Sequence, residues 1–313
     1  MNLSPAYHVL LNQSEPMLSG EEIRELSDHY QVLLLKGFLG DLLPKRFDSY
    51  FLDQMRWLRQ HGIHFRRLER ESGYFTQKLS ANNAQAIEHA IRTSYQERPG
   101  KKIIIVSHSK GGIDALETLL RQKQLIDTEV AGWIALQAPF RGTPVADWAT
   151  RNRLFNAFAE KMLGGPFKGD SKVAVSMTIE ARDNYMSRNS RAILDLSAKL
   201  NVLVFASSSE GGDASIFRPL RFAIEKIGKA RNDGMLPVES QLLQIDGVPC
   251  CPYIEAEHFD HIALVLPLTR GRYQEPGPSP EACRIRIFRA LLKIWMNNRG
   301  SPHRMPPRAM YST

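Results

Sequence analysis

The chain has 313 residues, enough to bury the core of one large α/β domain. Its 41 lysine and arginine residues outnumber its 33 aspartate and glutamate residues, which gives a formal net charge of +8. The basic residues are scattered among acidic ones and form no run with interleaved aromatic residues, so we expect no nucleic-acid partner.

Three cysteines, Cys250, Cys251 and Cys283, cannot all pair, and two of them are adjacent. This pattern is poor material for a disulfide scaffold and favours a reducing compartment. The N-terminal residues lack a basic start followed by a long apolar stretch, and no run of 18 apolar residues occurs. We therefore expect a cytoplasmic protein without a signal peptide or transmembrane segment.

Short apolar strands alternate with amphipathic helical stretches along the chain. In chain order, strands are expected at residues 31–35, 64–68, 102–106, 130–137, 201–206 and 253–256. Helices are expected at residues 43–61, 82–95, 113–122, 215–231 and 280–297. This alternation predicts an α/β fold with a mostly parallel central sheet and helices on both faces.

Residues from about 147 to 199 are largely helical in pattern and interrupt the rhythm of strands. We expect them to form a helical cap inserted into a core made of residues 31–146 and 200–298. Residues 1–30 would be an N-terminal extension, and residues 299–313, rich in proline and arginine, a disordered tail. The expected cap carries large apolar side chains suited to an acyl chain, namely Phe155, Phe158, Met162, Leu163 and Phe167.

The strongest expected strand runs directly into the sequence Ser-His-Ser-Lys-Gly-Gly at residues 107–112, which a helix follows. A serine at the centre of such a turn needs small residues two positions away on either side, because the strand and helix approach closely there. Ser107 and Gly111 meet that need around Ser109. The turn would lift the Ser109 hydroxyl above the sheet at the N-terminus of a helix, where developing negative charge is favoured.

This arrangement resembles the nucleophile turn of the α/β-hydrolase superfamily, and especially the GHSxGG sequence of bacterial triacylglycerol lipases. The chain differs at the first small position, where Ser107 replaces the usual glycine. A phosphate-binding turn is the other interpretation, but such loops usually carry a Lys-Ser or Lys-Thr pair, which is absent here. The resemblance implies an α/β-hydrolase fold with Ser109 as the nucleophile.

The same resemblance implies an oxyanion hole made of two backbone N–H groups. One would belong to Lys110, which follows the nucleophile. The other would belong to Phe38, because the sequence Lys-Gly-Phe-Leu-Gly at residues 36–40 resembles the HGxxG loop of those lipases. The chain has Lys36 where the lipases have histidine.

In this fold the acid of the catalytic triad follows the serine in the chain, and the histidine follows the acid. The sequence from Asn232 to Val238 resembles the DGxVP turn of the family, so Asp233 is the favoured acid, with Asp213 as the alternative. His261 precedes an apolar stretch in the manner of the DHxxL sequences of lipase-like hydrolases, so it is the favoured base. His258 is the alternative base, because its His-x-Asp spacing resembles a segment of some bacterial lipases.

Two further features complete the resemblance. The sequence from Ala138 to Asp147 resembles the APxxGTPxAD stretch of lipases, in which Thr143 would cap a helix that begins at Pro144. His108, beside the nucleophile, is expected to be a packed supporting residue, as in the family. Together the similarities extend from about residue 31 to residue 265 in the correct order.

The sequence therefore predicts hydrolysis of a carboxylic ester, of lipase or esterase type, through a Ser-His-Asp triad and an acyl-enzyme. We expect a substrate with an apolar acyl group, no cofactor, no metal and no obligate partner. The basic and apolar residues 217–227 suggest contact with a lipid surface. Acyltransferase, thioesterase, amidase and polyhydroxyalkanoate depolymerase activities would use the same triad, and the departures at Lys36 and Ser107 leave open a catalytically silent binding module.

Overall fold

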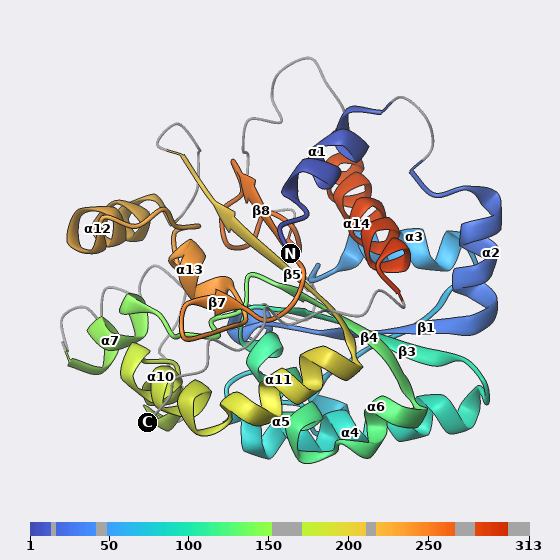
Figure 1. The fold of residues 1–313 in the computed structure, drawn as a ribbon, viewed down its shortest axis with the longest axis horizontal. Helices are drawn as coiled ribbons and strands as arrows, with labels where there is room; N and C mark the ends of the chain where they lie inside the picture. The colour runs from blue at the N-terminus through green and yellow to red at the C-terminus, as the bar shows by residue number, and fades with distance from the viewer. Residues whose placement is uncertain (14–16, 42–48, 152–170, 211–216, 267–278, 300–313) are drawn as a thin grey trace, which may run out of the picture.

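A computed structural model describes residues 1–13, 17–41, 49–151, 171–210, 217–266 and 279–299 (Figure 1). Its centre is a six-stranded sheet in the order β2-β1-β3-β4-β5-β8, in which every neighbouring pair is parallel. The strands are β1 (Tyr30–Leu35), β2 (His64–Arg67), β3 (Lys102–His108), β4 (Val130–Leu136), β5 (Asn201–Ser208) and β8 (Tyr253–Glu257). The expected fold class, a mostly parallel sheet between helices, is confirmed.

The central strands are apolar at nearly every position because helices cover both faces of the sheet. Along β3, Ile104 and Val106 pack into one core cluster, whereas Ile103 and Ile105 pack into the other. This alternation follows from the two-residue period of a strand.

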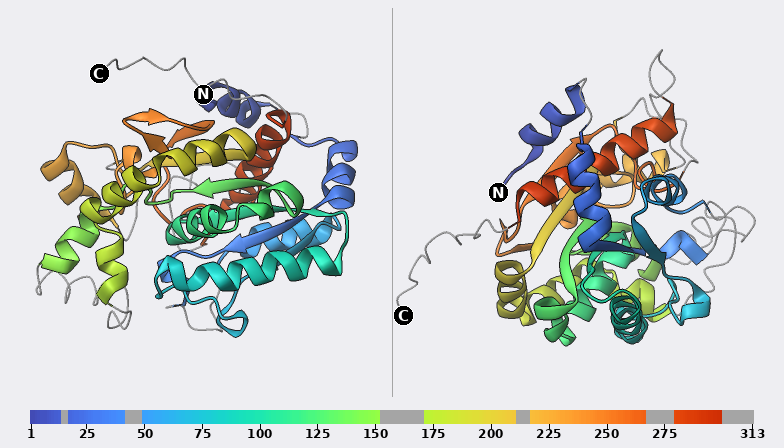
Figure 2. Two further views of the ribbon diagram at one scale, coloured as in Figure 1. Left: turned by 60° about the horizontal axis from the view of Figure 1, so that its bottom comes forward. Right: turned by 90° about the vertical axis from the view of Figure 1, so that its right-hand side faces the viewer.

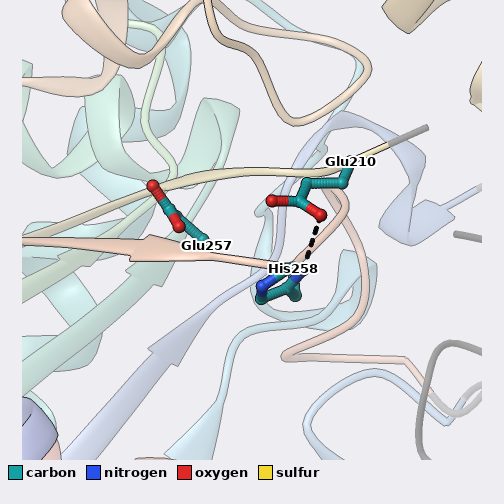
Figure 3. A group of neighbouring side chains, drawn as sticks. All are labelled: Glu210, Glu257 and His258. Carbon is teal, nitrogen blue, oxygen red and sulfur yellow. Dashed lines mark ion pairs between the residues drawn. The ribbon is translucent and has the colours of Figure 1, made fainter. Parts of the chain in front are cut away.

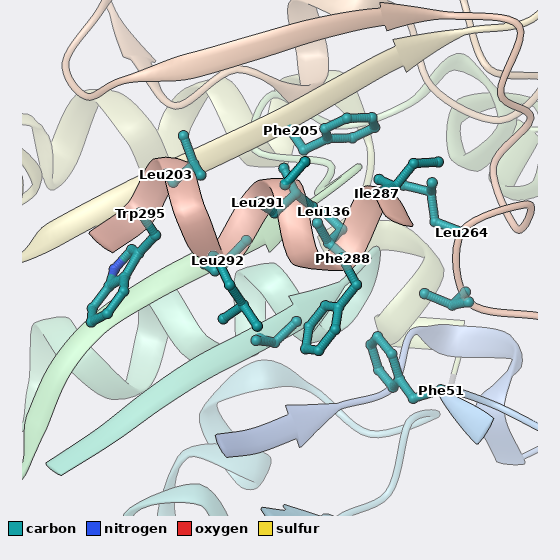
Figure 4. Close-up of a cluster of buried hydrophobic side chains, with 14 of the residues drawn as sticks. Phe51, Leu136, Leu203, Phe205, Leu264, Ile287, Phe288, Leu291, Leu292 and Trp295 are labelled. Carbon is teal, nitrogen blue, oxygen red and sulfur yellow. The ribbon is translucent and has the colours of Figure 1, made fainter. Parts of the chain in front are cut away.

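The first cluster is covered by helices from both ends of the chain. These are α1 (Ser4–Asn12), α2 (Gly20–His29), α3 (Leu52–Gln60) and α14 (Pro280–Asn297). The N-terminal helix α1 lies beside the C-terminal helix α14 (Figures 1 and 2). Figure 4 shows Leu291 of α14 beside Leu136 and Phe205 of the sheet, while Phe288 of the same helix points toward Phe51.

The second cluster lies under α4 (Ser80–Glu97), α5 (Lys110–Arg121), α6 (Gln124–Thr128) and α11 (Ser190–Lys199). The remaining described helices include α7 (Pro144–Arg151), α9 (Ser171–Ser176), α10 (Ile179–Arg188), α12 (Arg218–Gly228) and α13 (Val238–Gln241). A separate hairpin pairs β6 (Gln244–Ile245) with β7 (Val248–Pro249). Asp246 and Gly247 both have positive φ in its turn, which is the Asp-Gly geometry favoured in two-residue hairpins.

The expected cap contains α9, α10, α11 and most of α7, but its residues 152–170 lie outside the described residues. The five apolar side chains expected to contact an acyl chain all fall in that range. Ile193 and Leu196 of α11 belong to the second core cluster, so this helix packs onto the sheet. The division of the chain into core, cap, extension and tail stays a prediction.

One expected helix is wrong in part. The spacing predicts residues 49–51 as part of the helix at 43–61, but α3 begins only at Leu52, and residues 42–48 lie outside the described residues. Phe51 has a φ of +59°, which no right-handed helix accepts. Its N–H donates instead to the carbonyl oxygen of Val265 at 2.9 Å, so tertiary contacts override the helical spacing.

Two smaller differences concern helix ends. The helix expected at residues 215–231 ends at Gly228, because Lys229 adopts the left-handed conformation. The helix expected from residue 113 begins at Lys110, directly after Ser109. In the part of the chain that the structure describes, none of the helices is both long and apolar enough to cross a membrane. The cytoplasmic location stays a prediction.

Candidate active site

Ser109 occupies a sharp turn between the end of β3 at His108 and the start of α5 at Lys110. Its φ of +54° and ψ of −129° are strained for a residue with a Cβ. The backbone around it is firmly held, because the Ser109 N–H donates to the carbonyl oxygen of Leu136 at 2.9 Å. The strained turn therefore presents the hydroxyl in a fixed position.

The small residues around Ser109 are required by close contacts. A Cβ on Gly111 would lie 2.7 Å from the carbonyl oxygen of Leu35, and one on Gly112 would lie 2.4 Å from the Cβ of Ala138. Ser107 is fully buried, and its hydroxyl accepts a hydrogen bond from the Trp133 indole at 2.8 Å. The serine that replaces the usual glycine is therefore accommodated and hydrogen-bonded.

The structure brings Ser109, His261 and Asp233 together. Nε2 of His261 lies 2.8 Å from the Ser109 hydroxyl, and Nδ1 lies 2.8 Å from Oδ2 of Asp233. The imidazole follows the end of β8, and the carboxylate lies in the loop after α12. A proton on Nδ1 that is donated to the carboxylate leaves the Nε2 lone pair to accept the serine proton.

The Asp233 carboxylate is completely buried, and its hydrogen bonds satisfy both oxygens. Oδ1 accepts the N–H groups of Met235 at 2.9 Å and Leu236 at 2.7 Å, while Oδ2 accepts from His261. The N–H of His261 also donates to the carbonyl oxygen of Asp233 at 2.9 Å. The acid and the base are thus joined through both side chain and backbone, which fixes the ring against Ser109.

The alternative base lies elsewhere. His258 is exposed, and its Nδ1 lies 3.5 Å from Oε2 of Glu210 (Figure 3). Glu210, His258 and Glu257 offer possible metal-ligand atoms within 4.8 Å of one another, and all three side chains are exposed. However, Glu257 already pairs with Arg231 at 3.3 Å. The alternative acid, Asp213, lies outside the described residues.

The glycine loop after β1 lies against the nucleophile. A Cβ on Gly37 would approach the Cβ of Ser109 to 2.6 Å. Phe38 begins a short 3-10 turn, and its carbonyl oxygen accepts a hydrogen bond from Thr76 at 3.0 Å. On the other side, Lys110 is the first residue of α5, so its N–H has no acceptor within the helix. Both expected oxyanion donors therefore belong to segments that border Ser109.

Lys36 stands where the lipases have histidine. Its ammonium group forms ion pairs that hold the glycine loop in place. Its ammonium lies 2.5 Å from Glu69 and 3.6 Å from Asp41, and its side chain is 3% exposed. Its aliphatic stem packs against Gly40, where a Cβ would lie 2.7 Å from the Cβ of Lys36. Such partners offset the cost of removing an ammonium group from water.

Several supporting residues were not foreseen from the sequence. The side chain of Lys110 is 1% exposed and pairs with the fully buried Asp114 at 2.8 Å. Asn83 and Tyr74 also donate to Asp114. Burial, followed by the Asp114 charge, raises the pKa of Tyr74 well above its usual range.

Gln137 is the second unforeseen group. It follows β4 with a φ of +47° and is completely buried. Its amide donates to the Ser207 hydroxyl at 2.6 Å and to the carbonyl oxygen of Asp260 at 3.0 Å. No spacing in the sequence marks this residue, because its partners come from distant parts of the chain.

The two other expected supporting residues lie as predicted. His108 is buried beside the nucleophile. Burial, followed by the nearby His261, holds its pKa well below the usual range. The hydroxyl of Thr143 accepts the N–H of Val145 at 3.1 Å at the start of α7, which is the geometry of a helix cap.

Comparison with known structures identifies the fold to which this arrangement of strands, helices and site residues belongs. The chain is similar to a metagenomic carboxyl esterase, with 19% identity, a TM-score of 0.62, and coverage of 87% of this chain and 76% of that one. It is also similar to the mature form of a lipase from Bacillus licheniformis, with 18% identity, a TM-score of 0.58, and coverage of 75% and 85%. The chain has the α/β-hydrolase fold. The expected resemblance to bacterial lipases and esterases is thereby confirmed.

Sequence comparison adds a local match. Residues 67–151, from the end of β2 to α7, match the family model of lecithin:cholesterol acyltransferase. No curated protein matches significantly. The matched segment includes the Ser109 turn and the Thr143 cap.

Proposed function

We propose that this protein is a serine hydrolase that cleaves carboxylic esters. Ser109 is the nucleophile, His261 the general base and Asp233 the carboxylate that orients the base. The proposal rests on one observation, the two 2.8 Å contacts that join the Ser109 hydroxyl to His261 and His261 to the buried Asp233.

The reaction proceeds in two halves. His261 removes the Ser109 proton as the oxygen attacks the ester carbonyl, and the N–H groups of Phe38 and Lys110 stabilise the resulting oxyanion. The tetrahedral intermediate then collapses, and the leaving alcohol takes the proton from His261. Water, activated by the same imidazole, attacks the acyl-enzyme and releases the carboxylic acid and free Ser109. No step requires a metal or an organic cofactor.

The substrate is an ester with an apolar acyl group, presented at a lipid surface. Helix α12 supports this choice, because Phe222 and Ile227 on it are 51% and 71% exposed. Arg218, Lys226 and Lys229 are also exposed on this helix or at its end. Exposed apolar and basic side chains of this kind are suited to an anionic lipid surface.

Acyl transfer is the second candidate. The match of residues 67–151 to lecithin:cholesterol acyltransferase favours it over the other reactions that share the triad. The same acyl-enzyme would then be attacked by an acceptor alcohol in place of water. A thioesterase, an amidase or a polyhydroxyalkanoate depolymerase has no such support.

The first experiment is a panel of p-nitrophenyl esters from acetate to palmitate, run beside labelling with a fluorophosphonate. Wild-type protein should hydrolyse some of these esters and be labelled on Ser109. Ser109→Ala should not be labelled, and its kcat for ester hydrolysis should be lower by a factor on the order of 10⁴ or more. Full activity in Ser109→Ala would refute the mechanism. A silent binding module would show neither hydrolysis nor labelling in the wild type.

A matched pair of histidine variants identifies the base. His261→Gln should lose hydrolysis by roughly the same factor as Ser109→Ala, because the two residues act as one unit. His258→Gln should stay within about twofold of the wild type, since the ring points to Glu210. The reverse result would assign the base to His258.

Adding increasing amounts of an alcohol and measuring the ratio of ester to acid product then separates acyl transfer from hydrolysis.

A further inference from the structure

A chain of hydrogen bonds runs through the buried interior from the glycine loop to the base. The Gly37 N–H donates to the hydroxyl of Tyr50 at 3.0 Å, and that hydroxyl lies 2.5 Å from Nδ1 of His108. On the other side of the same ring, Nε2 of His108 lies 2.7 Å from the carbonyl oxygen of His261. Tyr50 and His108 are each 1% exposed, so water does not compete for these bonds.

The direction of every bond in this chain is fixed by its partners. Nε2 of His108 faces two acceptors, the carbonyl oxygen of His261 and Oε1 of Gln137, so it must carry the proton. Nδ1 is then a lone pair that accepts the Tyr50 hydroxyl proton, and the tyrosine oxygen in turn accepts the Gly37 N–H. Bonds that all point the same way polarise one another and are strengthened.

The protonation state of His108 is consistent with this assignment. Burial, followed by the nearby His261, holds the pKa of His108 well below its usual range, so the ring is neutral at neutral pH. A protonated ring would carry a hydrogen on Nδ1 and would displace the tyrosine proton. The chain of bonds therefore requires the neutral ring.

Both ends of the chain adjoin the reacting atoms. Gly37 lies directly against Ser109 and precedes the expected oxyanion donor Phe38. The carbonyl group of His261 belongs to the residue that accepts the Ser109 proton. A second link runs from His108 through Gln137, whose amide contacts Asp260 at 3.0 Å and Asp233 at 3.4 Å.

We propose that Tyr50 and His108 form a positioning relay, which holds the oxyanion loop and the His261 loop in register on either side of Ser109. The relay rests on the proposed function, because its role is to set the geometry of that site. Both side chains are buried, so neither is placed to contact a substrate. Tyr50 comes from a segment that also joins the His261 loop directly, since the Phe51 N–H donates to Val265 at 2.9 Å.

Replacing Tyr50 by phenylalanine removes the one oxygen on which both bonds depend. The Gly37 amide would lose its acceptor and the His108 ring its donor, and the oxyanion donor would shift from its productive position. Because losing an oxyanion donor outright costs about 10²–10³ in kcat, we expect displacement in Tyr50→Phe to cost about 10- to 100-fold in kcat, with KM changed less than about threefold.

Tyr30→Phe is the matched control. This substitution also removes one tyrosine oxygen, which lies 2.7 Å from Arg299. Tyr30, however, is the first residue of β1, whereas Gly37 follows the other end of that strand. This control should keep wild-type kinetics. A Tyr50→Phe protein that folds and keeps kcat within twofold of the wild type would overturn the relay.

A double-mutant cycle tests the coupling even if one variant is partly unstable. His108→Gln keeps an amide donor near the position of Nε2 but lacks the ring nitrogen that accepts from Tyr50. If the two residues act as one relay, the double variant should be no slower than the slower single variant, so the effects are not additive. Effects on kcat that multiply would show independent roles and refute the relay.

Fluorophosphonate labelling keeps this test separate from that of the proposed function. An unlabelled wild-type protein would refute the serine hydrolase itself. A wild-type protein that is labelled, beside a Tyr50→Phe protein labelled at the same rate, would refute only the relay. We expect Tyr50→Phe to be labelled about 10- to 100-fold more slowly, because the reagent also develops negative charge on an oxygen that the loop must stabilise.

Discussion

Gly37 is a position where one methyl group would disturb the site. Its absent Cβ would lie 2.6 Å from the Cβ of Ser109 and 2.7 Å from the Tyr50 hydroxyl, closer than side chains approach. We expect Gly37→Ala to lower kcat/KM by about 100-fold, because the oxyanion loop must move away from the nucleophile. Gly20→Ala is the control, since nothing lies within 4 Å of the added atom. Equal ester hydrolysis by the two folded variants would show that the loop can give way without loss.

His108 should make stability depend on pH below neutrality. Burial, followed by the nearby His261, holds its pKa well below the usual value, so the unfolded chain binds a proton that the native chain does not. Above about pH 6.5 the ring is therefore neutral in both states, and this group does not lower the free energy of unfolding. Below about pH 6.5 the free energy of unfolding falls by about 1.4 kcal/mol for each pH unit, until the pH reaches the pKa of His108 in the folded protein.

Urea unfolding of the wild type and of His108→Gln between pH 5 and 7.5 measures how the free energy of unfolding of each protein depends on pH. On acidification, the free energy of unfolding should fall less steeply in the variant than in the wild type. The two slopes against pH should differ by up to the amount that corresponds to one proton per molecule. Parallel profiles would show that His108 is protonated equally in both states.

The residues of the proposed triad were predictable because each lies in a short local pattern. Ser109 is surrounded by small residues between a strand and a helix, and Asp233 precedes a glycine in a tight turn. Tyr50 and Gln137 had no such signal. Their roles depend on partners that the fold brings from other segments, and the spacing of Tyr50 even indicated a helix that does not exist there.

At the scale of elements, α5 depends on a buried ion pair in its first turns. The Lys110 ammonium and the Asp114 carboxylate are 1% and 0% exposed and lie 2.8 Å apart. Removing the carboxylate in Asp114→Asn would leave a buried cation unpaired, so we expect a loss of about 3–5 kcal/mol in the free energy of unfolding.

The control for this prediction is another pair four residues apart on a helix. Glu225 is 54% exposed and pairs with Arg221 at 2.8 Å, so Glu225→Gln should cost less than about 1 kcal/mol. Chemical denaturation with urea measures both variants. Equal losses would mean that the Lys110–Asp114 pair contributes no more to stability than an exposed pair.

The strands and the helices that cover them were predictable because their apolar residues are periodic. The ends were less so, since caps and tertiary bonds set them, as the left-handed Lys229 does for α12. The helices α1 and α2 were missed, although Ser19 and Glu22 form a capping box at the start of α2. The hairpin of β6 and β7 is too short for any periodicity to appear, and only its Asp-Gly pair marks it.

At the scale of the whole molecule, the site forms where the carboxyl ends of the parallel strands meet. Gly37 follows β1, Ser109 follows β3, and His261 follows β8, so residues more than 200 positions apart converge at one edge of the sheet. The order of these residues in the chain was predictable from the resemblance to lipases. Their distances were not, because strand order and register are set by packing across the entire sheet.

Helix α12 connects this edge to the molecular surface. Phe217, just before the helix, packs against Gly234 and lies edge-on to the His261 ring at 6.4 Å. The side chains of Phe222 and Ile227 on the same helix are exposed. In Figure 1, α12 lies at the same end of the molecule as α7 and α10. Lipid contact through α12 is a prediction that two substitutions on this helix test.

Replacing both exposed residues, Phe222→Ser with Ile227→Ser, should weaken adsorption to phosphatidylglycerol vesicles. Each apolar side chain inserted into lipid contributes about 1.5–3 kcal/mol when fully buried, so we expect at least a roughly tenfold loss in the partition coefficient. Val248→Ser, at a residue 52% exposed in the β6–β7 hairpin, is the control. Hydrolysis of soluble p-nitrophenyl acetate should stay unchanged in both variants, while hydrolysis of an emulsified long-chain ester should fall only in the α12 variant. Vesicle binding equal to that of the wild type would remove α12 from the lipid contact and leave the triad chemistry untouched.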